Sequence, residues 1–152
     1  MQDHKRAVVG WVEYVELPDW KISRLRAKMD SGARNSALHV ENIREVGRDR
    51  VRFDVRLHRR NVERRVTVET TIKRRGKVRA SSGQAEQRIF VTACVRIGAY
   101  EQDVELSLVD RQKMIFRMLI GRSALAERYL VDAGKRYLVS KPRRTAPRKT
   151  AP

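Results

Sequence analysis

The sequence is poor in the features that mark secreted and membrane proteins. Its 152 residues include one cysteine, Cys94, so no internal disulfide can form, and this favours a reducing compartment. No apolar run approaches the ~18 residues of a membrane helix. The apolar stretch 7–11 is also too short for the core of a signal peptide. We therefore expect a cytoplasmic protein that is not a membrane protein.

Patterns that bind metals or nucleotides are also absent. The histidines His4, His39 and His58 and the single cysteine form neither a His-Glu-x-x-His nor a Cys-x-x-Cys pattern. A glycine-rich phosphate loop is missing as well. Aromatic residues make up only 6% of the chain, and no predicted strand carries the clustered aromatics of single-strand nucleic-acid binders. The sequence thus predicts no metal and no cofactor.

Positive charge is what the sequence has in excess. Its 35 Lys and Arg residues outnumber 18 Asp and Glu, for a net charge of +17. Five of the cations lie in residues 141–152, which contain no acid, so residues 1–140 retain +12. We expect one folded domain over residues 1–140 and a disordered basic tail over residues 141–152. A positive charge of this size attracts nucleic acid, an anionic membrane surface or an acidic peptide, and charge alone does not choose among these partners.

Alternation of apolar and polar residues, rich in β-branched side chains, predicts half-buried strands along most of the chain. The predicted strands are Val8–Leu17, Leu25–Met29, Ala37–Ile43, Val51–Leu57, Val66–Thr70, Ile89–Ile97, Val104–Leu108, Tyr129–Val131 and Arg136–Val139. A hairpin with its turn near Gly98 should join Ile89–Ile97 to Val104–Leu108. One short helix, Ser123–Arg128, is expected near the C-terminus, with Ser123 as its N-cap. These elements predict an all-β closed barrel or sandwich.

Three motifs are candidates for chemistry. In Asp30-Ser31-Gly32, glycine permits a tight turn, the hydroxyl can lock it, and the carboxylate is presented at a strand end. Alone, this tripeptide is common in ordinary turns. Met118–Arg122 is an apolar strand that ends abruptly at Gly121, and it also fits an ordinary core strand. Residues 75–88 contain small residues within a strand pattern, which fits either a surface hairpin or a flap that covers substrate.

The order of these motifs resembles that of retropepsins. More closely, the chain resembles a bacterial retropepsin-like family of the RimB type, often labelled ATP-dependent zinc protease and linked to the RimK glutamate ligase. The matching residues are Gly10–Glu13, Leu17-Pro18, Ala27–His39, Ser81–Gly83, Glu86, Arg88, Asp110-Arg111, Met114 and Arg117–Arg122. The resemblance runs from about Val9 to Leu138. Ser31 stands where the family usually has Thr, and the basic tail has no counterpart.

The resemblance implies an aspartic peptidase in which Asp30, Ser31 and Gly32 form the catalytic turn. Such an enzyme needs two adjacent carboxylates that share one proton. Because the chain has only one such turn, we expect a homodimer that brings two copies of Asp30 together.

The resemblance also implies an acidic substrate: a glutamate-rich tail, such as that of a modified small-subunit ribosomal protein. Arginine binds carboxylates in a bidentate manner, so basic residues near the turn and flap are candidate contacts. The candidate substrate-binding residues are Ala33, Arg34, Arg79, Ser81, Ser82, Gly83, Arg88, Arg111 and Arg122. Each arginine also fits a solvated surface charge.

Three alternatives stay open. The chain could be a non-catalytic basic β-barrel that binds RNA or the ribosome, with the tail as a candidate RNA contact. It could be a zinc hydrolase, as the family label says, or a degenerate retropepsin fold used only for partner binding. His39 lies close to the Asp30 turn in sequence, where it could line the site or serve a structural role.

Overall fold

The chain folds into strands that close into a ring. The computed structural model describes residues 5–58, 63–79 and 82–141, and within them ten strands are joined by hydrogen bonds. The elements are β1 (Ala7–Leu17), the 3₁₀ helix η1 (Pro18–Trp20), β2 (Ile22–Met29), β3 (Ser36–Val46), β4 (Arg50–Arg56), β5 (Arg65–Thr71), β6 (Arg74–Arg79), β7 (Ala85–Ile97), β8 (Tyr100–Val109), β9 (Met118–Ile120), α1 (Arg122–Leu125) and β10 (Tyr129–Arg136). The all-β fold with one short helix is confirmed.

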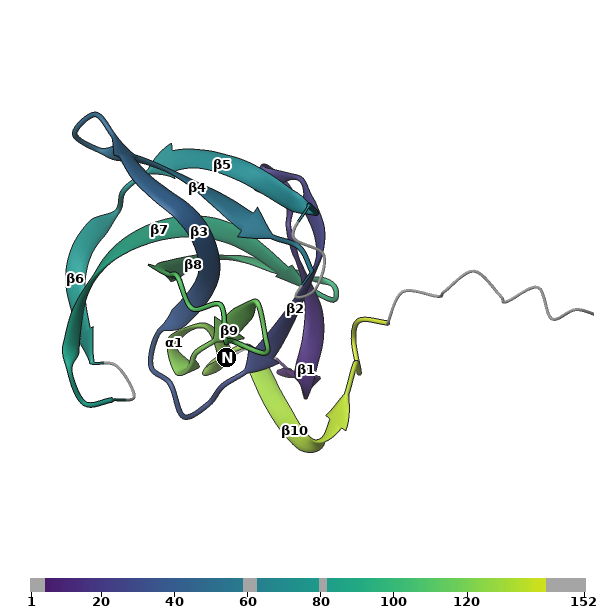
Figure 1. Cartoon of the computed structure of the whole chain (residues 1–152). Helices are drawn as coiled ribbons and strands as arrows, with labels where there is room; N and C mark the ends of the chain where they lie inside the picture. Colours follow the sequence, from purple (N-terminus) through teal and green to yellow (C-terminus); the bar gives the residue numbers. More distant parts are fainter. Residues whose placement is uncertain (1–4, 59–62, 80–81, 142–152) are drawn as a thin grey trace, which may run out of the picture.

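The ring runs β1-β2-β9-β3-β8-β7 and closes where Glu16 of β1 pairs with Arg96 of β7. β10 lies parallel to β1 outside this ring, and β6 extends β7. β4 pairs with β3 and then with β5, forming a second layer above the barrel (Figure 1). The short strand β9 is inserted between β2 and β3, parallel to the first and antiparallel to the second. This insertion places the chain after β2 beside the chain after β9.

Alternating side chains fill the inside of the ring, as the period-two pattern predicts. The fully buried residues include Val15, Leu25, Leu38, Val91, Leu106 and Ile120, one or more from each side of the barrel. Phe53 of β4 packs edge-on against Trp20 of η1, with ring centroids 5.6 Å apart. The second layer therefore shares the core of the barrel. Among the described residues, no helix is long or apolar enough to cross a membrane.

The helix differs from the predicted Ser123–Arg128. It spans Arg122–Leu125, and its N-cap is Gly121 rather than Ser123. The reason is the carbonyl of Arg34, which accepts hydrogen bonds from both the amide and the hydroxyl of Ser123, at 3.1 and 2.8 Å. The serine thus joins the helix to the loop after β2 instead of capping the helix.

The two predicted closing strands are also different. A single strand, β10, runs from Tyr129 to Arg136, and Tyr137 then takes a left-handed φ of 56°. The amides of residues 138–140 donate to the Glu13 carboxylate instead of to a neighbouring strand. The predicted strand over Arg136–Val139 is therefore wrong. Residues 142–152 of the predicted tail lie outside the described residues.

Candidate active site

Asp30 follows the last residue of β2 and is held there by backbone contacts. Its amide donates to the carbonyl of Ile120, at 2.7 Å, which continues the β2–β9 pairing. Its Oδ1 accepts the amide of Gly32, at 3.1 Å. The side chain is half-buried, whereas Ser31 and Gly32 are exposed. The carboxylate is therefore oriented by the turn at an open face of the molecule, where a second chain or a substrate can reach it.

Gly32 is required for a different reason from the one that the sequence suggests. The glycines with a positive φ among the described residues are Gly47, Gly83 and Gly98, so the turn at Gly32 does not need a left-handed backbone. A Cβ at Gly32 would instead lie 3.3 Å from Oδ1 of Asp30. The small residue allows the Gly32 amide to approach the carboxylate closely.

The Asp30 turn and the β9–α1 junction form one interlocked unit. The amide of Arg122 donates to the carbonyl of Ala33, at 2.7 Å, and the amide of Gly121 donates to the hydroxyl of Ser36, at 3.0 Å. A Cβ at Gly121 would lie 2.5 Å from the carbonyl oxygen of Asn35, which is closer than real Cβ atoms approach. Gly121 is therefore what permits the two loops to cross.

The side chain of Arg122 contacts the backbone of the Asp30 turn. Its Nη1 donates to the carbonyls of Ser31 and Gly32, each at 3.1 Å. These two contacts use the guanidinium to fix the residues that follow Asp30. The structure thus places Arg122, a predicted substrate contact, against the backbone of the Asp30 turn.

The predicted flap is a hairpin formed by β6 and β7, with Arg79 paired with Ala85 next to its tip. Arg79, Ser82 and Gly83 are all exposed, and Gly83 has a φ of 86°. Ser81 lies outside the described residues. In Figure 1 the end of β6 and the start of β7 lie at the lower left of the barrel, on the same side as α1.

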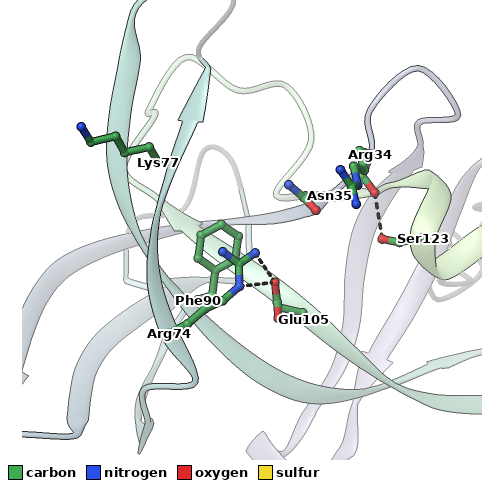
Figure 2. Close-up of a pocket in the computed structure, with 7 residues that line it drawn as sticks. All are labelled: Arg34, Asn35, Arg74, Lys77, Phe90, Glu105 and Ser123. Atoms are coloured by element: carbon green, nitrogen blue, oxygen red, sulfur yellow. Dashed lines mark hydrogen bonds and ion pairs between the residues drawn. The ribbon is translucent and has the colours of Figure 1, made fainter.

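A pocket of about 510 Å³ lies between the base of this hairpin and the loop after Asp30. Its lining residues are Arg34, Asn35, Arg74, Lys77, Phe90, Glu105 and Ser123. Figure 2 shows Arg34, Asn35 and Ser123 on one side of the space, and Arg74 with Phe90 and Glu105 on the other. The pocket therefore lies between the loop after Asp30, the β6–β7 hairpin and β8.

Charge in the pocket is predominantly positive. Arg74 lies over the ring of Phe90, 3.7 Å from its centroid, and its Nε donates to Glu105 at 3.0 Å. This hydrogen bond, with a smaller effect of Lys73, holds the pKa of Glu105 below its usual range. The carboxylate of Glu105 is thus already paired with Arg74. Among the described residues, no carboxylate forms an ion pair with Arg34, so its guanidinium is available to a ligand.

Arg88 and Arg111 are brought together by a shared acid rather than by the pocket. Glu86 accepts from Arg88 at 2.9 Å and lies 4.0 Å from Arg111. The hydrogen bond from Arg88 lowers the pKa of Glu86. Arg88 is nearly buried, at 9% exposure, whereas Glu86 is exposed. These two predicted contacts form an ion cluster on β7 and the loop after β8.

His39 has a structural environment. It is fully buried, and its Nδ1 accepts the amide of Arg111 at 3.0 Å, so the neutral ring carries its proton on Nε2. Burial, with the nearby charge of Arg117, lowers the pKa of His39. Among the described residues, no group of three or more His, Cys, Asp or Glu side chains could hold a metal ion. The side chains of the described residues therefore do not fit a zinc site.

Sequence reasoning missed most of the pocket. Arg74 and Glu105 meet across β6, β7 and β8, and neither has a distinctive sequence neighbourhood. Phe90 lies in the predicted strand Ile89–Ile97, in which every second residue from Ile89 onward is apolar. The one available signal was a large aromatic residue at an outward position of that alternation.

Comparisons with known proteins agree with this geometry. The family described as "Retropepsin-like aspartic endopeptidase RimB" matches residues 8–142. A protein from Shewanella halifaxensis named "Probable alpha-L-glutamate ligase" is 32% identical over 142 residues, which cover 90% of this chain and 30% of that protein. One of the same name from Desulfotalea psychrophila is 34% identical over 139 residues, covering 86% and 29%. The chain thus spans less than a third of the length of these relatives.

A solved structure shares the fold. It is the crystal structure of a protein of unknown function from Legionella pneumophila, and the two chains superpose with a TM-score of 0.74 at 25% sequence identity. The superposition covers 90% of this chain and 100% of the other.

Proposed function

Because the chain belongs to the family of the retropepsin-like aspartic endopeptidase RimB, we propose that it is an aspartic endopeptidase that acts as a homodimer. The observation that carries this proposal is the placement of Asp30. Its carboxylate is oriented by the Gly32 amide on a turn that is interlocked with the β9–α1 junction, at an open face. One chain contributes one such carboxylate, and a twofold partner would supply the second.

Two carboxylates at hydrogen-bonding distance share one proton, because both cannot ionise together at low cost. The ionised Asp30 would take a proton from a bound water, which attacks the scissile carbonyl. The protonated Asp30 of the partner subunit would donate a hydrogen bond to the carbonyl oxygen. The hydroxyl of Ser31 would brace the pair, and Arg122 would keep the turn in place through its two carbonyl contacts.

The pocket beside the turn supports an acidic substrate. Arg34 and Lys77 are the cations of this pocket without an ion-pair partner among the described residues, and Glu105 is already bound by Arg74. A substrate glutamate that enters here would meet a guanidinium able to bind it through two hydrogen bonds. Arg34 would therefore select acidic side chains, with Ala33, Arg79, Ser82 and Gly83 lining the path of the peptide.

The relatives support glutamate as the acidic residue. Proteins named as glutamate ligases contain a segment that matches nearly this whole chain. A peptidase segment joined to a ligase would act on the ligated product, so we propose that the substrate is a glutamate-rich peptide tail. A ribosomal protein that carries such a tail would place the reaction in the cytoplasm.

The test uses a peptide that ends in several glutamates and a matched peptide with glutamines. Wild type should release glutamate fragments, detected by mass spectrometry, whereas Asp30→Asn should lose at least about 10³-fold in kcat/KM because it removes the general base and acid. Arg34→Gln should lose about 10–100-fold on the glutamate peptide and little on the glutamine peptide.

Two results would reject the proposal. Absence of cleavage by wild type from acid to neutral pH would favour the basic β-barrel that only binds RNA or the ribosome. Cleavage that persists in Asp30→Asn but disappears with a chelator would favour a metal-dependent hydrolase. A uniform loss in Arg34→Gln on both peptides would reject only the acidic subsite.

A further inference from the structure

Aromatic and arginine side chains form a continuous layer on the outer side of β1, β2 and β10. This aromatic–arginine face consists of Trp11, Tyr14, Arg24, Arg26, Phe116, Arg136 and Tyr137. Along β2 the arginines alternate with the buried residues Leu25 and Ala27, so they point away from the core. In Figure 1, β1, β2 and β10 lie on the right side of the barrel, opposite β6.

Half of the face is built around Trp11. Arg136 lies over its ring, with Cζ 4.6 Å from the centroid. Phe116, from the loop before β9, meets Trp11 edge-on at 5.9 Å, and Arg26 lies 5.0 Å above the Phe116 ring. Two guanidinium groups therefore lie over aromatic rings.

The other half is built around two tyrosines. Tyr14 and Tyr137 are stacked, with centroids 5.0 Å apart and an interplanar angle of 13°. Arg24 lies 4.3 Å above Tyr14, and Arg26 donates to the hydroxyl of Tyr137 at 3.0 Å. Arg24 also donates to the carbonyl of Lys141, at 3.1 Å. The segment in which the sequence becomes uniformly basic thus starts at this face.

The arginines of the face differ in their partners from five arginines of β4, β6 and β7. Arg50, Arg52, Arg74, Arg75 and Arg96 each form an ion pair with a glutamate. No carboxylate of the described residues lies within 4 Å of the charged groups of Arg24, Arg26 or Arg136. These three arginines lie over aromatic rings instead of carboxylates, so their positive charges can still attract an anion.

This arrangement weakens the sequence argument against nucleic-acid binding. That argument was the lack of aromatic residues clustered on one strand. The four aromatic residues of the face come from three separate parts of the chain, and only the fold brings them together. Flat guanidinium planes stack with unpaired bases, and their N–H groups bind phosphate.

We propose that the aromatic–arginine face binds single-stranded RNA. Phosphates would be bound by the guanidinium groups and bases would stack on their planes. The inference does not depend on peptidase activity. It assigns to the side of the barrel away from the flap a role in docking the protein on an RNA-containing particle.

The test compares two double variants that remove the same charge. Arg24→Gln/Arg26→Gln changes the face, and Arg50→Gln/Arg52→Gln changes two paired arginines at the same spacing on β4. Anisotropy of a fluorescein-labelled single-stranded RNA of about 16 nucleotides is measured between about 50 and 200 mM salt. The face variant should bind at least about tenfold more weakly, and its salt slope should fall by about 1.4. The β4 variant should stay within about twofold of wild type.

Four outcomes would overturn the proposal. Equal weakening in both variants would assign binding to net charge, and no RNA binding by wild type at low salt would reject it. Tighter binding of a polyglutamate peptide than of RNA, lost in the face variant, would make the face a peptide exosite. Because Arg26 also contacts Tyr137, its replacement can disturb the fold, so the single variant Arg136→Gln is measured as well. Thermal unfolding checks that each variant is folded. An unchanged RNA affinity in folded Arg136→Gln would count against the proposal.

Discussion

At the scale of single residues, Glu13 is a buried carboxylate that accepts several hydrogen bonds from the segment after β10. It is fully buried and accepts the amides of Gly10, Leu138, Val139 and Ser140, at 2.6, 2.8, 3.3 and 3.0 Å. It also accepts the hydroxyl of Ser140, at 2.6 Å. These donors compensate for the lost hydration of a buried charge. Glu13 thereby fastens the segment after β10 to β1.

We predict that Glu13→Gln lowers the free energy of unfolding by about 3 kcal/mol. The side chain keeps its size, but its amide group faces backbone amides that need an acceptor. Urea denaturation of the variant measures the loss. Glu127→Gln is the matched control, because Glu127 is exposed, and it should change stability by less than about 0.5 kcal/mol. A loss no larger than that of the control would show that the segment is held by its other contacts.

Little of this residue-scale detail could be predicted from the sequence. An acid at an inward position of the Val8–Leu17 alternation was the one signal for Glu13, and its donor Leu138 is 125 positions away. His39 is similar, since its partner Arg111 comes from another loop. Asp30 became a candidate through the order of the motifs and the family resemblance, which need no knowledge of distant contacts, and its catalytic role stays a prediction.

At the scale of elements, alternation predicted most strands to within a few residues, because the alternation of a half-buried strand is visible in its local sequence. The β7–β8 hairpin also followed from local signals, and its Gly98 has a φ of 61°. What the sequence could not show was pairing between distant strands. The insertion of β9 between β2 and β3 and the closure through Glu16 and Arg96 depend on long-range contacts.

The crossing of the Asp30 loop and the β9–α1 junction gives a prediction for Gly121→Ala. The new Cβ would lie 2.5 Å from the carbonyl oxygen of Asn35 and 2.8 Å from that of Arg34, and backbone atoms cannot move aside as a side chain can. We expect a loss of about 1–3 kcal/mol in stability and a lower kcat on the glutamate peptide, because the catalytic turn is displaced.

Gly134→Ala is the control for this variant. Its Cβ would lie 3.5 Å from the nearest atom, Oδ1 of Asp132, which is an ordinary contact, and Gly134 does not have a positive φ. Thermal unfolding and peptide kinetics compare the two. If Gly121→Ala behaved like Gly134→Ala, the two loops would be less tightly interlocked than the distances indicate.

At the scale of the whole molecule, the proposed mechanism requires two chains for each active site. Wild type and Asp30→Asn are co-refolded in varying ratios, so that subunits pair at random. If each site needs an Asp30 from both chains, activity should fall as the square of the wild-type fraction, to about one quarter in an equal mixture. A site contained in one chain would give a linear fall, to about one half. The control mixes wild type with Glu127→Gln, which should leave activity unchanged. The shape of the curve therefore separates a shared site from a single-chain site. The choice of substrate and the dimer affinity change the amplitude of the activity and not the curvature.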